Sequence, residues 1–91
     1  MSMRLVLIEW VDSAHGSSGW APLADCTPEL LTVRSVGWLL HDTSECKVIV
    51  PHVCEPGAGS RIETQGRGDM TIPNACIVKL YDLIDPTLLI V

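Results

Sequence analysis

The stretch from residue 30 to residue 41 constrains the fold more than any other part of the chain. It reads Leu-Leu-Thr-Val-Arg-Ser-Val-Gly-Trp-Leu-Leu-His, with apolar side chains on both faces of an extended chain and Gly37 in mid-strand. Aliphatic and β-branched residues at this density favour a strand. A glycine inside a strand indicates a bulge or a sharp bend, which a sheet needs in order to close into a small barrel. We therefore expect a long, bent strand here.

The other apolar stretches are also short and extended, and none has the 3.6-residue spacing of a helix. Strands are expected over residues 3–11, 46–53, 69–72 and 75–82. Pro51 has no N–H to donate, so its strand should end there or lie at an edge. Pro73 and Asn74 predict a tight turn before the last strand. This order of elements resembles Src-homology-3-like and Sm-like folds, so we expect an all-β, small five-strand barrel.

A chain of 91 residues accommodates one domain, spanning residues 1–91. Two parts of it lie outside the expected strands. Residues 55–68 hold four of the seven glycines and predict a long flexible loop. Residues 83–91 form an apolar tail, which should dock either on its own sheet or on a neighbouring subunit. Because so short a chain buries only about 60–65% of its unfolded surface, homo-oligomerisation is the expected source of further stability.

Charge and hydropathy exclude several classes of partner. The net charge is −5 with six Lys plus Arg, which argues against duplex DNA as a ligand. No apolar run reaches the roughly 18–20 residues that span a bilayer. Glu9 and Asp12 interrupt the first apolar run and no signal-peptide cleavage site follows, so we expect a cytoplasmic protein without a membrane partner. The four cysteines are expected as free, mostly buried thiols, with two disulfides as the open alternative.

The residue patterns do not predict an enzyme. Asp12, Ser13 and His15 share one loop, but no Gly-x-Ser-x-Gly elbow holds the serine, so a polar turn is the better interpretation. His52 and Cys54 lack the close paired spacing that is typical of structural zinc ligands. No carboxylate pair is placed across a pocket by its spacing. We expect no catalytic residue, no metal and no cofactor.

The glycine-rich loop is the candidate binding site. Glycine lets backbone N–H groups approach an anion closely, and arginine can bind phosphate through two hydrogen bonds. Tryptophan can stack on a nucleotide base, although in a chain without Phe it also serves as a core filler or lid. The candidate ligand-binding residues are Arg61, Arg67, Gly66, Gly68, Trp20 and Trp38. A hairpin loop without any ligand is the alternative.

Four short motifs occur along the chain: Ile-Glu-Trp-Val-Asp-Ser at 8–13, Ser-Gly-Trp at 18–20, Val-Gly-Trp-Leu-Leu at 36–40, and Met-Thr-Ile-Pro at 70–73 with Ile77. Together they resemble a family of small, uncharacterised phage-encoded proteins with paired Gly-Trp motifs. The resemblance covers roughly residues 4–80 and includes neither the cysteines nor the tail. It implies a product of a bacteriophage or prophage that acts in the bacterial cytoplasm, and it brings no catalytic residues.

The resemblance and the candidate site together suggest a non-enzymatic phage accessory protein. Its partner would be a host protein or a nucleotide second messenger that it sequesters, thereby antagonising host antiviral defence. Two alternatives stay open: an Sm-like protein that binds RNA or single strands, and a structural or assembly module of the virion. The residues do not identify the ligand, the number of subunits or the role of the tail.

Overall fold

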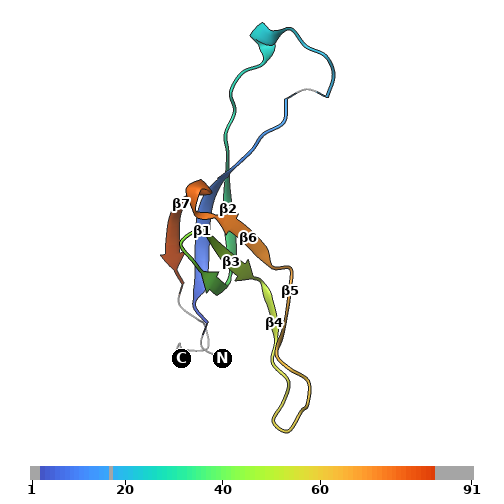
Figure 1. Cartoon of the computed structure of the whole chain (residues 1–91), viewed down its shortest axis with the longest axis vertical. Coiled ribbons are helices and arrows are strands. Elements are labelled where there is room, and N and C mark those ends of the chain that lie inside the picture. Colours follow the sequence, from blue (N-terminus) through green and yellow to red (C-terminus); the bar gives the residue numbers. More distant parts are fainter. Residues whose placement is uncertain (1–2, 17, 84–91) are drawn as a thin grey trace, which may run out of the picture.

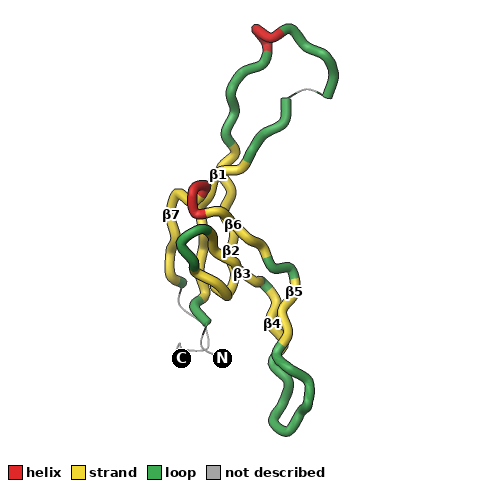
Figure 2. The backbone as a smooth tube through the Cα atoms, in the orientation of Figure 1, coloured by secondary structure: helices red, strands yellow, loops and turns green. Residues whose placement is uncertain are grey.

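The computed structural model describes residues 3–16 and 18–83 and confirms the all-β class (Figures 1 and 2). Its regular elements in chain order are β1 (Leu5–Asp12), η1 (Leu23–Asp25), β2 (Leu31–Asp42), β3 (Cys46–Val50), β4 (His52–Cys54), β5 (Gln65–Arg67), β6 (Met70–Pro73), η2 (Asn74–Cys76) and β7 (Ile77–Asp82). The two elements named η are single 3₁₀ turns. Among the described residues, no helix is long and apolar enough to cross a membrane.

Five strands form one antiparallel sheet in the order β6-β3-β2-β1-β7. The first and last described strands, β1 and β7, therefore lie side by side. Within the described residues, however, the two edge strands β6 and β7 do not pair with each other, so the sheet is open. The expected closed barrel is wrong. β3 ends at Pro51, and the chain then continues into β4 and β5, which pair with each other in a separate sheet and do not extend the main sheet toward β7.

The core lies on one face of this curved sheet. Val6 and Ile8 on β1 are completely buried, and the period of two along the strand places Trp10 on the same face. The Trp10 indole Nε1–H donates to Ser35 Oγ at 3.0 Å, which satisfies its polar group while the ring packs on the core. The remaining buried apolar side chains are Leu39, Ile49, Val50 and Ile72, with Ile77 and Leu80 packed partly buried beside them.

Gly37 lies where β2 packs closely against β3. A Cβ atom at this position would lie 3.1 Å from Ile49 Cβ and 3.2 Å from the backbone of Val50. The ladder irregularity that we expected occurs two residues later, where the register of β2 against β3 shifts between Leu39 and His41. The sequence therefore predicted an irregularity in β2 but placed it two residues too early. Gly37 allows β2 and β3 to pack closely, and the register shift lies between Leu39 and His41.

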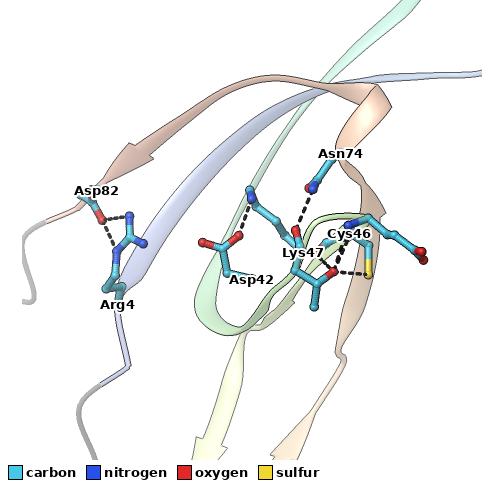
Figure 3. A network of polar contacts seen from close by, with 8 residues as sticks. Arg4, Asp42, Cys46, Lys47, Asn74 and Asp82 are labelled. Atoms are coloured by element: carbon cyan, nitrogen blue, oxygen red, sulfur yellow. Dashed lines mark hydrogen bonds and ion pairs between the residues drawn. The ribbon is translucent and has the colours of Figure 1, made fainter.

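The predicted turn at residues 73–74 is confirmed as η2, and polar contacts tie it to the turn between β2 and β3 (Figure 3). Asn74 Nδ2 donates to the carbonyl of Thr43 at 2.8 Å, and the Asn74 backbone N–H donates to the carbonyl of Glu45 at 2.9 Å. Nearby, Lys47 pairs with Asp42, and the Arg4 guanidinium holds Asp82 at 2.7 Å. These bonds join both edges of the sheet to its centre.

Two segments project from the sheet at opposite ends of the molecule (Figure 1). We call residues 13–30, which include η1, the arm, and we call β4, β5 and the loop between them the ribbon. The molecule measures 63 × 30 × 29 Å with a radius of gyration of 18.2 Å. A compact chain of this length would have a radius of gyration of about 12 Å. The projections therefore dominate the shape.

Three other expectations need correction or lie outside the described residues. Residues 55–68 are not wholly loop, because β5 lies within them and pairs with β4. The cysteines are free as expected, but Cys26 and Cys54 are exposed and the other two only half-buried, since each lies on a loop, a turn or a strand end away from the core. Of the tail at 83–91, all but Leu83 lies outside the described residues.

Candidate functional site

The ribbon begins where the pairing between β3 and β6 ends. Pro51 ends β3, as its missing N–H predicts. On the facing strand, Gly68 has a φ of +78°, a conformation that favours glycine, and a Cβ there would lie 3.2 Å from Pro51 Cγ. The two residues interrupt the pairing opposite each other. Pairing then resumes as β4 and β5, which run away from the sheet (Figure 1).

The register of the ribbon gathers four polar side chains on one face. His52 lies opposite Arg67, and Cys54 lies opposite Gln65. Residues two apart on a strand share a face, so all four point the same way. They are exposed, and together with Val53 and Gly66 they line a hollow of 590 Å³.

The opposite face of the ribbon packs on the sheet. A Cβ at Gly66 would lie 2.9 Å from Val50 Cγ2, so the missing side chain at this position allows the ribbon to approach the core. From the sequence, the backbone N–H groups of Gly66 and Gly68 were expected to contact an anion. In the structure, Gly66 lets the ribbon pack against Val50, and Gly68 adopts the left-handed backbone conformation of a turn.

The two arginines of the ribbon differ from most other cations of the chain in their ion pairing. Arg4, Arg34 and Lys47 each form an ion pair with a carboxylate, and Lys79 lies 4.6 Å from the centre of the Tyr81 ring. Within residues 3–16 and 18–83, no ion pair engages the remaining two cations, Arg61 and Arg67. Both belong to the ribbon, and both are exposed. Among the described residues, this end of a negatively charged protein thus presents two cations that form no ion pair.

The structure brings together only part of the predicted site. Arg67 lies on β5 beside Gly66, and Arg61 lies in the loop beyond β4 and β5. Trp38 lies on β2, half-buried between Leu5 and Val50 on the neighbouring strands. Trp20 lies in the arm, at the other end of the molecule from the ribbon (Figure 1). Within one copy of the chain, Trp20 therefore cannot stack on a ligand that the arginines hold.

One member of the polar face has no role in the interpretation of the sequence, and two others have a different one there. Gln65 was not considered, and His52 and Cys54 were weighed only as metal ligands. No group of three or more His, Cys, Asp or Glu in the described part of the chain could hold a metal ion. One feature of the sequence could have revealed this polar face. His52-x-Cys54 and Gln65-x-Arg67 have the same spacing and lie on either side of a glycine-rich loop, which is the pattern of a hairpin.

Comparison with protein-family models, with curated proteins and with solved structures finds no match to this chain.

Proposed function

We propose that this protein is a non-enzymatic binding protein that holds a phosphate-bearing ligand on the polar face of the ribbon. The observation that carries the proposal is Arg67, which lies opposite His52 and makes no ion pair among the described residues. A guanidinium can donate two parallel hydrogen bonds to a phosphate, and the imidazole across the ladder can donate a third.

The dimensions and the remaining groups suit a small ligand. The hollow of 590 Å³ lies within the range of about 300–1,000 Å³ that is usual for small-molecule sites. The Gln65 amide can both donate and accept, as recognition of a base or sugar requires. Arg61 in the adjoining loop offers a second cation for a ligand with more than one phosphate. Because the whole protein carries a charge of −5, these local cations favour a small anion over a nucleic-acid duplex.

The resemblance described above extends the proposal to the biological setting. The paired Gly-Trp motifs support a phage accessory protein acting in the bacterial cytoplasm, and a nucleotide second messenger of host defence would then be the phosphate-bearing ligand. The strand order, with β7 beside β1 and η2 between β6 and β7, supports an opened relative of the Src-homology-3-like fold. A fold does not by itself specify a ligand, so the ribbon carries the functional argument.

A thermal-shift panel tests the proposal. It contains pyrophosphate, cyclic dinucleotides, cyclic trinucleotides, ADP-ribose and short RNA. A ligand at 100 times its dissociation constant adds about 2.7 kcal/mol, which raises Tm by about 10 °C in a domain of this size. We expect Arg67→Ala to abolish the shift. Arg34→Ala is the matched control, since Arg34 is an exposed arginine on the sheet that pairs with Glu9.

Either of two results would refute the assignment. One is a panel member that binds Arg67→Ala as tightly as wild type, because the ligand would then lie elsewhere. The other is a panel without any shift, because no phosphate compound of these classes would then be held. Binding of RNA alone, with equal loss in Arg34→Ala and Arg67→Ala, would indicate a diffuse electrostatic contact instead of this site.

A further inference from the structure

The arm exposes large apolar side chains far from the core. Trp20 is fully exposed, and Leu23 and Leu30 are 88% and 78% exposed. The arm has local order around them: the Asp25 N–H donates to the Pro22 carbonyl at 2.9 Å, closing the η1 turn. Leaving three such side chains in water is unfavourable, and tryptophan is among the residues that contribute most to protein interfaces. The arm therefore has the composition of a docking element.

The opposite end of the molecule holds an apolar pocket that suits an indole ring. It has a volume of 330 Å³ and lies at the base of the ribbon, on the side facing the sheet. Its apolar lining comes from Met3, Leu40, Val50 and Val53, and its polar lining from Thr64, Gln65 and Asp69. A buried tryptophan needs an acceptor for its N–H, and the oxygen atoms of these polar residues provide one.

A chain cannot fill this pocket with its own arm. The arm leaves the sheet after Asp12 and returns at Leu31, whereas Met3 and Leu40 lie toward the other ends of the same two strands. At about 3.3 Å per residue, the eight residues of β1 separate those ends by roughly 26 Å. The arm also points away from the sheet (Figure 1). The arm of the same chain therefore does not reach the pocket, and the apolar residues 84–91 lie outside the described residues.

The exposed surface of the chain is large enough for an interface with a second copy. The accessible surface is 7456 Å² for a mass of 9.9 kDa. A compact monomer of that mass exposes about 5,200 Å². The excess of about 2,200 Å² exceeds the roughly 1,600 Å² that a standard interface buries in total. One arm and one pocket on each copy supply matching halves of such an interface.

We propose that copies of this chain associate head to tail, with Trp20 of one copy inserted into the pocket of Met3, Leu40, Val50 and Val53 in the next. Such a contact joins two different surfaces, so it closes into a ring if the rotation allows and otherwise continues as a filament. Val53, Gln65 and Gly66 line both this pocket and the hollow on the polar face, but Arg67 lines the hollow alone, so Arg67→Ala should leave the contact unchanged.

Sedimentation of four proteins tests the contact. We expect wild type to exceed 9.9 kDa. Trp20→Ala removes the inserted side chain, and Leu40→Glu places a charge in the pocket at a position already 48% exposed. Each should weaken self-association by about 30-fold or more, as truncating a central interface residue does. Val78→Ala removes an exposed side chain from β7 and is the matched control, which should keep the wild-type mass.

Mixing the two variants gives the decisive result. Trp20→Ala retains an intact pocket and Leu40→Glu retains an intact arm, so the mixture should form a 1:1 dimer although neither variant assembles alone. Far-UV circular dichroism verifies that both variants are folded. A wild type that is monomeric at millimolar concentration would overturn the proposal and assign the arm to a different protein. Wild-type assembly that persists in folded Trp20→Ala would overturn it as well.

Discussion

Replacing Gly37 by alanine tests whether the tertiary structure really brings β2 and β3 as close as described. The added methyl would lie 3.1 Å from Ile49 Cβ, 3.2 Å from the Val50 carbonyl carbon and 3.2 Å from the Val50 nitrogen. Two of these three atoms belong to the backbone, so a side-chain rotation cannot relieve the contact. The strands must separate, and the adjacent core residues Ile49 and Val50 must move with them.

The expected loss of folding stability in Gly37→Ala is the difference between two opposing effects. Overpacking a close-packed core costs about 1–3 kcal/mol. Alanine in place of glycine restricts the unfolded chain, which offsets about 0.4–1 kcal/mol of that cost. The net destabilisation of Gly37→Ala is therefore about 1–2 kcal/mol, which lowers Tm by about 5–15 °C in a domain of this length.

The assay is urea unfolding and thermal unfolding at one fixed protein concentration, because self-association would make Tm depend on concentration. Gly57→Ala is the matched control: its Cβ would meet no atom within 4 Å, and its φ is not positive. That variant should be neutral or more stable than wild type by up to about 1 kcal/mol. If Gly37→Ala is as stable as Gly57→Ala, β2 and β3 do not approach as described and the reasoning fails.

Two further measurements address the core and the polar network. Ile8 is completely buried, so Ile8→Ala should cost about 2–5 kcal/mol in urea unfolding, whereas Val36→Ala on the other face of the sheet should cost about 0.5 kcal/mol; similar losses would refute the assignment of the core face. The hydrogen bond from Lys47, reinforced by its charge, lowers the pKa of Asp42 below 3.8, so the pair stabilises the fold above that pH and its contribution disappears as the pH falls through the lowered pKa. In an NMR titration of the Asp42 carboxyl, Lys47→Met should raise the pKa toward 3.8, and an unchanged pKa would refute the role of the pair.

Much of the fold could be predicted because its determinants are local. Dense runs of aliphatic and β-branched side chains located the strands around Ile8, around Val36 and near the end of the chain. Pro51 located the end of β3, and Pro73 with Asn74 located the turn at η2. Each of these signals acts through its own backbone, either by side-chain period or by a missing N–H, and does not depend on distant residues.

The candidate site could be predicted only in part. Arg67 was identified from its chemistry, but its partner across the ladder, His52, depends on a pairing between segments separated by a loop. Three-residue polar strands have no apolar period that would reveal them. Trp20 was grouped with the arginines because tryptophan can stack on a nucleotide base, and the structure separates them along the 63 Å axis of the molecule.

The sequence by itself located the five strands of the main sheet and the cations that the chain offers an anion. The tertiary structure alone decided that the sheet stays open, that the ribbon's register sets Arg67 opposite His52, and that the arm and the pocket lie at opposite ends. The physical reason is the distance along the chain over which each determinant acts. The alternation of side chains along a strand and the presence or absence of a backbone N–H affect only residues that are close in sequence. Register, closure and the direction of a projecting arm depend on contacts between residues far apart in the chain.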